Sequence, residues 1–270
     1  MTVIVTLITR YCTVHASDSF ITELQPDGTC LIREAERTKI VPVEGFHGAM
    51  AYWGVAKIPS RWSTYDWLAK QAGRACDFRH PEDFANHMAD ELNKRFSKLP
   101  VERKIDLGIG IHFTAYEYVQ DHWIPELFVL SNFSDPTYQE LHKEGVIVNR
   151  QTYNTISQTK PRPEHREAEF RLRVRTHLQD GEILIYNNGD PLMFNPAADA
   201  LFQQISEIRK RGSLKAMDDV STYRKIAKIP IKMVSKVQRE LYRSEFRVVG
   251  GKIHDLSITP HGEYFSDSGD

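Results

Sequence analysis

The residue with the clearest chemical potential in this sequence is Thr2, which directly follows Met1. Methionine before a small residue such as threonine is normally removed, so we expect the mature chain to begin at Thr2. The α-amine freed in this way has a reference pKa of about 7.7–8.0, close to working pH, and stands beside the threonine hydroxyl. Because such an amine can accept the hydroxyl proton, Thr2 is the candidate nucleophile.

Short segments at both ends of the chain share a pattern with a known family. The chain opens with MTVIV and continues at 16–22 with ASDSFIT, while VGGKIH (249–254) and ITPHG (258–262) lie near its end. Counted from Thr2, Asp18 and Thr22 fall at the spacing of the proteasome β-subunit family and its bacterial relatives, which this chain resembles. The resemblance implies an N-terminal-nucleophile (Ntn) hydrolase fold.

The resemblance also implies roles for further residues. Asp18 would orient the lysine of the site and hold its charge. Lys39, in TKIVPV (38–43), would lower the pKa of the nucleophile and its amine, and Arg37 is the competing assignment for that role. Gly54, which ends GAMAYWG (48–54), would supply the backbone N–H that stabilises the oxyanion of the tetrahedral intermediate.

Cysteine and histidine spacing gives no indication of a metal or cofactor. The chain has three cysteines, an odd number without a CxxC spacing, which argues against a disulfide framework and a zinc site. The spacing typical of metal ligands is also absent among four histidines that we considered, His15, His47, His112 and His122. We therefore expect a site that works with protein groups alone.

Charge and hydropathy restrict the partners. Lys+Arg is 35 and Asp+Glu is 36, so the net charge of -1 argues against a nucleic-acid partner, for which only the arginine-rich stretch 166–175 speaks. No run of eighteen apolar residues is present, so we expect no membrane span. The opening residues are too short and polar for a signal peptide, and the expected compartment is the cytoplasm.

The expected elements alternate between groups of strands and pairs of helices. Strands are predicted at 2–7, 12–16, 20–33 (a pair about the turn at 26–28), 38–43, 48–55, 105–113, 124–133 and 182–186. Helices are predicted at 64–73 after the cap Ser63, at 82–99 after Pro81, at 195–210, and at 220–242 with a kink at Pro230. A closing hairpin is predicted from 246–249 and 253–259 about Gly250-Gly251.

This order predicts an α+β fold over a single domain, 1–270. Specifically, it fits a four-layer αββα sandwich in which two antiparallel sheets lie between helix pairs. The family resemblance implies a peptide or unfolded-protein substrate, a homo-oligomeric ring that encloses the site, and an ATPase unfoldase as a further partner.

Two functions of different classes are compatible with these features. The first is a threonine-type peptidase or amidohydrolase, which needs Met1 removed and a lysine beside Thr2. The second is a catalytically silent Ntn-fold protein that serves as an assembly or binding subunit and needs neither. Phe246 and Val249 stand where the family usually has an aspartate and a serine before the closing glycines, and this departure bears on the choice.

Overall fold

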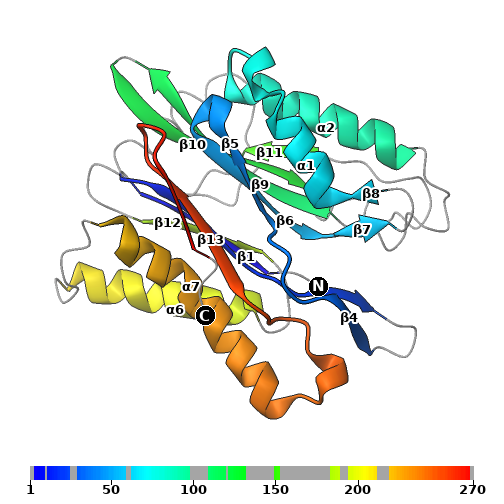
Figure 1. Ribbon diagram of the computed structural model, residues 1–270. Helices are drawn as coiled ribbons and strands as arrows, with labels where there is room; N and C mark the ends of the chain where they lie inside the picture. The colour runs from blue at the N-terminus through cyan, green and yellow to red at the C-terminus, as the bar shows by residue number, and fades with distance from the viewer. Residues whose placement is uncertain are drawn as a thin grey trace.

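Figure 1 shows the computed structural model of the chain. It describes residues 3–9, 11–24, 29–58, 62–97, 109–119, 121–131, 149–152, 183–188, 194–211 and 219–267. Within these ranges the chain forms a mixed α+β fold with two five-stranded sheets and four α-helices. The predicted α+β class is therefore confirmed.

The first sheet contains the N-terminal and C-terminal strands of the chain. Its order is β12-β1-β2-β13-β14, and every neighbouring pair is antiparallel. The strands are β1 (Ile4–Ile8), β2 (Thr13–Asp18), β12 (Leu184–Asn188), β13 (Ile253–Ile258) and β14 (Tyr264–Asp267). All residues of β1 and β2 are buried, which agrees with strands that are covered on both faces.

The second sheet is built from the middle of the chain, with the order β11-β10-β9-β6-β5. Its strands are β5 (Ile40–Val43), β6 (Gly48–Gly54), β9 (Ile109–Val119), β10 (His122–Ser131) and β11 (Asn149–Thr152). The predicted antiparallel pair in this region is confirmed as β9 and β10. Two small hairpins complete the strands: β3 (Ile21–Leu24) with β4 (Cys30–Glu34), and β7 (Lys57–Ile58) with β8 (Trp62–Ser63).

The four helices lie close to their predicted positions. They are α1 (Thr64–Ala72), α2 (Pro81–Ser97), α6 (Phe194–Lys210) and α7 (Val220–Leu241). The Ser63 side chain accepts a hydrogen bond from the Asp66 amide at 3.3 Å, so its predicted role as the cap of α1 is confirmed. Three single-turn 3₁₀ helices also occur, η1 (Glu44–Phe46), η2 (Ala75–Asp77) and η3 (Ser244–Phe246).

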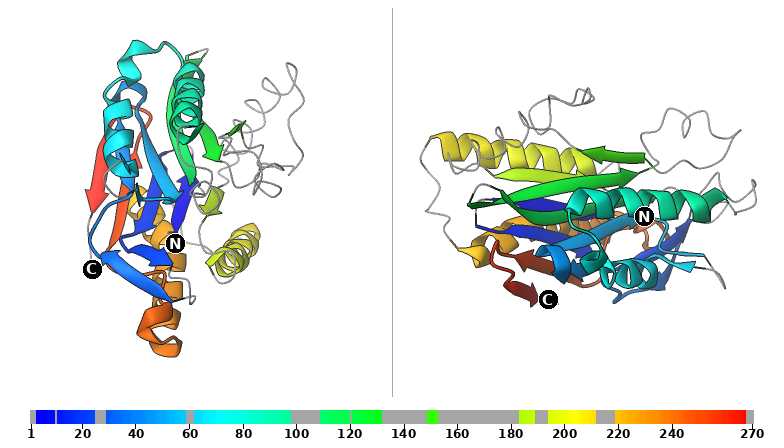
Figure 2. Two further views of the ribbon diagram at one scale, coloured as in Figure 1. Left: turned by 90° about the vertical axis from the view of Figure 1, so that its right-hand side faces the viewer. Right: turned by 90° about the horizontal axis from the view of Figure 1, so that it is seen from above.

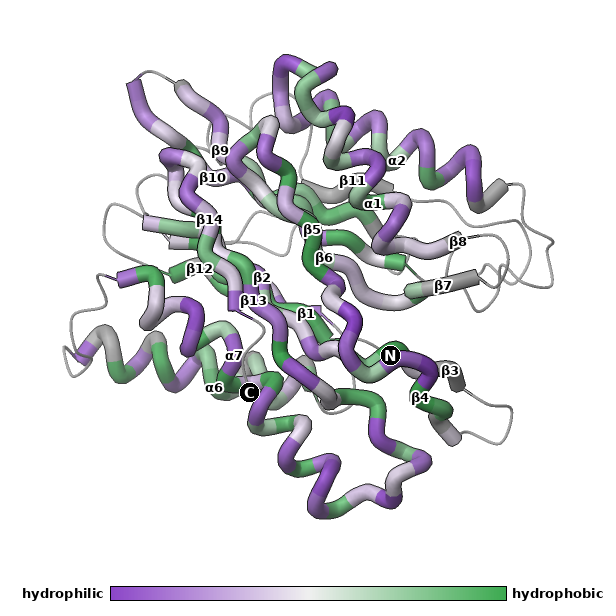
Figure 3. Tube along the Cα trace, viewed as in Figure 1, coloured by the Kyte–Doolittle hydropathy of each residue, from purple (hydrophilic) through white to green (hydrophobic). Residues whose placement is uncertain are grey.

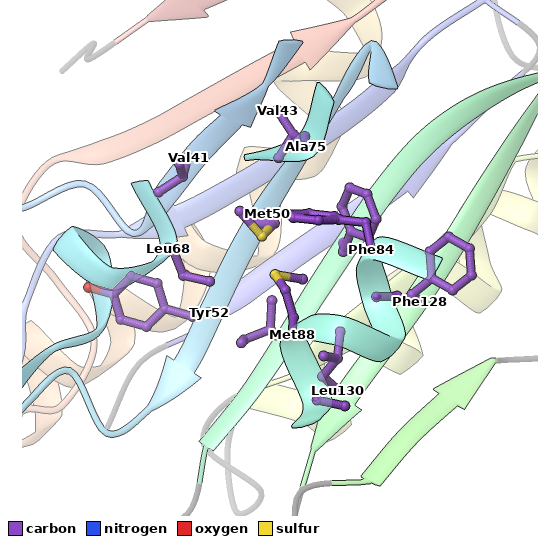
Figure 4. Close-up of a cluster of buried hydrophobic side chains, with 14 of the residues drawn as sticks. Val41, Val43, Met50, Tyr52, Leu68, Ala75, Phe84, Met88, Phe128 and Leu130 are labelled. Atoms are coloured by element: carbon purple, nitrogen blue, oxygen red, sulfur yellow. The ribbon is translucent and has the colours of Figure 1, made fainter. Parts of the chain in front are cut away.

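Three apolar clusters show which faces the sheets bury. The cluster in Figure 4 joins α1 and α2 to the second sheet, with Leu68, Phe84 and Met88 against strand residues such as Met50 and Phe128. Another cluster joins α6 and α7 to the first sheet. The third lies between the two sheets and includes Ile4, Leu127 and Ile258. The two helix pairs accordingly occupy opposite sides of the sheets (Figures 1 and 2).

The colours of Figure 3 agree with this packing, because apolar residues concentrate on the sheet strands while the helices alternate between apolar and polar residues. Helix α7 shows the pattern clearly: Tyr223, Ile226, Ile231 and Val234 are buried, and Lys232 and Lys236 are exposed. The helix continues through Pro230 from Val220 to Leu241.

A chain of polar side chains crosses the otherwise apolar layer between the sheets. The Thr6 hydroxyl lies 3.0 Å from His15 Nδ1 and 2.8 Å from His112 Nδ1. His15 Nε2 lies 2.8 Å from the Thr114 hydroxyl, and His112 Nε2 lies 2.8 Å from Asn188 Nδ2. These contacts connect β1, β2 and β12 of one sheet with β9 of the other, so they fix how the sheets face each other.

The predicted closing hairpin about Gly250-Gly251 is wrong. The segment before the glycines is not a strand: residues 244–246 form η3, and the amides of Val248 and Val249 donate to the Gln238 side chain instead of to a neighbouring strand. The C-terminal hairpin pairs β13 with β14. A side-chain acceptor that satisfies backbone donors removes the need for a ladder there.

Candidate functional site

The centre of the candidate site is an ion pair between Asp18 and Lys39. Lys39 Nζ lies 2.7 Å from Asp18 Oδ1, and both side chains are completely buried. Asp18 is the last residue of β2, and Lys39 directly precedes β5, so the pair joins the two sheets at one end. Two residues that are 21 positions apart in sequence are thus brought together, as the family resemblance predicts.

Further hydrogen bonds hold both partners in place. Asp18 Oδ1 accepts from the Val3 amide at 3.1 Å, and Asp18 Oδ2 accepts from the Gly250 amide at 3.3 Å. Lys39 Nζ also donates to the Phe20 carbonyl at 2.6 Å. A buried charge needs such partners, because an ion pair alone rarely compensates the loss of hydration. Backbone groups from three separate segments of the chain therefore bind the charged pair.

The surroundings of Lys39 alter its acidity. Burial lowers the pKa of the Lys39 ammonium below its usual value, while the Asp18 carboxylate opposes that change by its charge and its hydrogen bond. A lysine in this position supplies a positive charge at a fixed point in a region without bulk water. Such a charge stabilises a nearby anion strongly, since water does not screen it.

Arg37, the competing candidate for the basic residue, lies elsewhere. Its guanidinium is paired with Glu34 at 3.4 Å and with Asp66 at 3.0 Å, and it packs over the Tyr65 ring at 5.4 Å. About a quarter of its side chain is exposed to solvent. The structure therefore brings Lys39, and not Arg37, to Asp18.

Thr2 lies outside the described residues, but its neighbour in the chain is part of the site. Val3 is fully buried, and its amide nitrogen, which is bonded covalently to the carbonyl carbon of Thr2, donates to Asp18 Oδ1 at 3.1 Å. The same carboxylate oxygen accepts from Lys39. The backbone that directly follows Thr2 is thus bound to the Asp18–Lys39 pair.

Gly54 ends β6, the strand next to β5 in the second sheet. The backbone of β6 contacts the lysine directly, because the Tyr52 amide donates to the Lys39 carbonyl at 3.2 Å two residues before Gly54. Gly54 has a φ of 85°, a conformation that favours glycine, and it is half-buried. Gly54 ends a strand, as predicted, and its role as oxyanion donor stays a prediction.

Thr22, the other residue that carries the family spacing, lies in β3. It pairs with Ile32 of β4, next to an irregularity in the register between Ile21 and Thr22. Thr22 therefore belongs to the β3–β4 hairpin that follows the site.

Sequence reasoning missed Gln238 of α7, which is fully buried and shapes the segment beside Asp18. Gln238 Oε1 accepts from the amides of Val248 and Val249 at 3.0 and 2.9 Å. The next residue, Gly250, donates to Asp18, and its carbonyl accepts from the Ser19 and Phe20 amides. No local sequence signal marks a glutamine for this role, since its partners follow ten residues later.

Gly250 owes its identity to close packing. A Cβ atom at this position would lie 2.5 Å from the Phe20 ring, so the ring would have to move to admit any side chain. The following Gly251 has a φ of 76°, which favours glycine for a second reason. The two glycines therefore allow the 249–251 backbone to approach Asp18, a role that differs from the hairpin turn predicted for them.

No metal site is found in the part of the chain that the structure describes, where no three His, Cys, Asp or Glu side chains are grouped to hold an ion. The described helices include none with the length and apolar character needed to cross a membrane. The arginine-rich stretch 166–175 lies outside the described residues.

Comparisons with known proteins give no family assignment. No family model matches the chain, and no curated protein matches it.

Proposed function

We propose that this chain is an N-terminal-nucleophile hydrolase of the proteasome β-subunit type, with Thr2 as the nucleophile after removal of Met1. The observation that carries the proposal is the buried Asp18–Lys39 pair, which holds the Val3 amide at 3.1 Å, one residue from Thr2. The alternation of sheets and helix pairs supports a four-layer αββα sandwich over a single domain.

The proposed reaction cleaves an amide bond in two steps. The free α-amine of Thr2 accepts the hydroxyl proton, and the oxygen attacks the amide carbonyl to give a tetrahedral oxyanion. The backbone N–H of Gly54 donates to that oxyanion, and the charge of Lys39 lowers the pKa of the nucleophile. Collapse of the intermediate passes the proton to the leaving amine and forms an ester at Thr2, which water then hydrolyses to a carboxylic acid.

The substrate class that fits this chemistry is a peptide or an unfolded protein. By its resemblance, the protein would work in the cytoplasm inside a homo-oligomeric ring, supplied by an ATPase unfoldase. The alternative is a catalytically silent Ntn-fold subunit that binds or assembles with other chains. The two differ in one property, namely whether Thr2 is free and reactive.

Substitution of the nucleophile tests the proposal. We expect Thr2→Ala to abolish turnover of fluorogenic peptide amides while its circular dichroism and melting temperature match the parent protein. Thr2→Ser, which keeps a hydroxyl beside the amine, should retain measurable turnover and serves as the matched control. Turnover by Thr2→Ala at the parental rate would refute the nucleophile assignment, and absence of turnover in the parent would favour the silent subunit.

A further inference from the structure

The C-terminal end of α7 and the turn that follows it expose large apolar side chains. Leu241 is 76% exposed to solvent, and Tyr242 and Phe246 are 38% and 42% exposed. Other apolar side chains of the same helix, such as Ile231 and Val234, are buried against the first sheet. A single exposed apolar residue is ordinary, whereas several close together mark a surface that binds something.

Hydrogen bonds hold this turn in its shape. The Arg247 guanidinium donates to the carbonyl oxygens of Arg239 at 3.0 Å and Tyr242 at 3.4 Å. The Val248 amide, which follows directly, donates to the buried Gln238 side chain at 3.0 Å. Because both ends of the turn are tied to α7, the exposure of its apolar side chains is built into the fold.

Strand β4 extends the exposed apolar surface. It lies against η3, and its Leu31 and Ile32 are 42% and 38% exposed. Figure 1 and the left view of Figure 2 show the end of α7 and η3, drawn in orange, projecting beyond the two five-stranded sheets. We call the exposed side chains at this end the apolar tip; they are Leu31, Ile32, Leu241, Tyr242 and Phe246.

Positive charge accompanies the apolar tip along the outer side of α7. The exposed cations there are Lys225, Lys232, Lys236, Arg239 and Arg243. Glu240 is the single acidic residue in the stretch 225–243, and it lies 3.5 Å from Arg239. The whole chain has a net charge of -1, so this excess of positive charge is local.

The combination of cations and apolar side chains distinguishes between classes of partner. The phosphates of a nucleic acid would match the cations but leave the apolar tip in water. A second copy in a two-fold contact would bring the same cations together, and these repel each other. An acidic helix from another protein would need a groove for its apolar anchors, whereas this end of the molecule projects.

A bilayer that contains anionic lipids offers both kinds of contact. Its headgroups attract lysine and arginine, and the boundary of its acyl chains accepts leucine, phenylalanine and tyrosine. A projecting end can also meet a flat surface without obstruction from the sheets. Anionic lipids are concentrated in the leaflet that faces the cytoplasm, which is the compartment proposed for this chain.

We propose that the apolar tip and the exposed cations of α7 form a peripheral docking surface for an anionic membrane. The tip enters the boundary of the acyl chains, and the cations lie among the headgroups. The chain reaches the bilayer in this way without a helix that spans it. This binding activity goes beyond the proposed hydrolysis and does not depend on Thr2.

Vesicle sedimentation with the full-length protein tests the proposal. We expect the protein to sediment with phosphatidylcholine vesicles that contain about 30 mol% phosphatidylserine, and far less with pure phosphatidylcholine vesicles. Binding should weaken as the salt concentration rises from about 0.1 M to about 0.5 M, because salt screens exposed charges. Equal sedimentation with the two kinds of vesicle, or none with either, would overturn the proposal.

Paired substitutions show whether the α7 cations are responsible. Each lysine near an anionic bilayer contributes about 5-fold to affinity, so Lys232→Gln combined with Lys236→Gln should bind about 25-fold more weakly. The matched control is Lys70→Gln combined with Lys94→Gln, which removes two exposed lysines from α1 and α2 and should bind like the parent protein. All four lysines are exposed, so the melting temperature should not change. An equal loss of binding in both double variants would contradict a surface on α7.

The apolar tip has a separate test. Leu241→Gln should bind about 10-fold more weakly, because a leucine that leaves water contributes on this scale. In Leu241→Trp, lipids brominated on their acyl chains should quench the added indole, whereas they should not quench the indole of Lys70→Trp. Parental affinity of Leu241→Gln would contradict insertion of the tip, and tighter binding of a short DNA duplex than of the vesicles would assign the surface to nucleic acid instead. These readouts need no turnover, so their failure is distinct from failure of the Thr2 proposal.

Discussion

At the scale of residues, the site depends on a charge pair that is costly to bury and costly to break. Asp18 and Lys39 are each completely buried, and their 2.7 Å contact is supported by three backbone groups. Removal of one partner of a buried pair leaves the other uncompensated, whereas removal of both leaves only neutral groups. Stability and reactivity should therefore respond differently to single and double substitution.

We predict that Asp18→Asn and Lys39→Met each lower the free energy of unfolding by about 3–5 kcal/mol. The double variant should recover part of that loss, because no unpaired charge remains. Its reaction with an epoxyketone should stay as low as that of Lys39→Met, since the lysine charge is missing. Urea unfolding and adduct formation by mass spectrometry measure the two quantities, and Arg37→Met is the control that keeps the buried pair intact.

Recovery of reactivity together with stability in the double variant would show that the pair only holds the fold.

Gln238 carries a second prediction at this scale. Gln238→Leu keeps the volume of the side chain but removes the acceptor of the Val248 and Val249 amides. Two buried N–H groups would lose their partner, so we expect a loss of about 2–4 kcal/mol in unfolding free energy. The adjacent, mostly exposed Arg239 provides the control, and Arg239→Gln should change stability by less than about 0.5 kcal/mol. A Gln238→Leu variant as stable as the control would contradict the assigned role.

The residues of the site differ in how far sequence alone identifies them. Asp18 was predicted from the family resemblance, because its spacing from Thr2 matches the family pattern. Lys39 and Arg37 remained alternatives, because both precede the same strand and only the fold decides which side chain reaches Asp18. Gln238 and Gly250 were missed as site residues, because their partners lie outside their local sequence. Gln238 of α7 accepts from the amides of Val248 and Val249. The Gly250 amide donates to Asp18, which lies 232 positions earlier in the chain.

At the scale of elements, the helices and most strands followed from local patterns, because caps and apolar spacing act within a few residues. The α1 cap at Ser63 and the start of α2 at Pro81 are examples. The closing hairpin failed for a tertiary reason. Apolar residues at 246–249 resemble a strand locally, but the Gln238 side chain takes the hydrogen bonds that a strand would offer to a neighbour.

The polar chain between the sheets gives a prediction about acid. Burial lowers the pKa of His15 and of His112 to about 3, from 6.5 in the unfolded chain. Below pH 6.5 these two histidines therefore bind protons in the unfolded state but not in the folded state. As a result, the free energy of unfolding falls as pH decreases toward 3. For two histidines, the free energy of unfolding should fall by about 3 kcal/mol between pH 6.5 and pH 5.

Urea unfolding at a series of pH values measures this loss. His112→Gln should reduce the slope of unfolding free energy against pH by about half, because only one of the two histidines that take up a proton on unfolding then remains. His261 is exposed, so His261→Gln is the matched control and should keep the parental slope. A stability that is constant from pH 6.5 to pH 5 would exclude the buried neutral network.

At the scale of the whole molecule, the fold assembles the site from segments that are distant in sequence. The start of the chain, the end of β2, the entry to β5 and the 250 region converge on one carboxylate. Val3 directly precedes β1, Asp18 ends β2, Lys39 directly precedes β5, and Gly250 lies between η3 and β13. This convergence explains why spacing near the N-terminus predicted part of the site, while the contributions of the C-terminal segments required the structure.

The most direct test of the proposed function is intact mass spectrometry of the native protein, with and without an epoxyketone or β-lactone directed at N-terminal threonine. The proposal predicts a mass that lacks Met1, one covalent adduct per chain, and localisation of that adduct to Thr2 by fragmentation. Retention of Met1 and absence of an adduct would contradict it and would favour the silent Ntn-fold subunit.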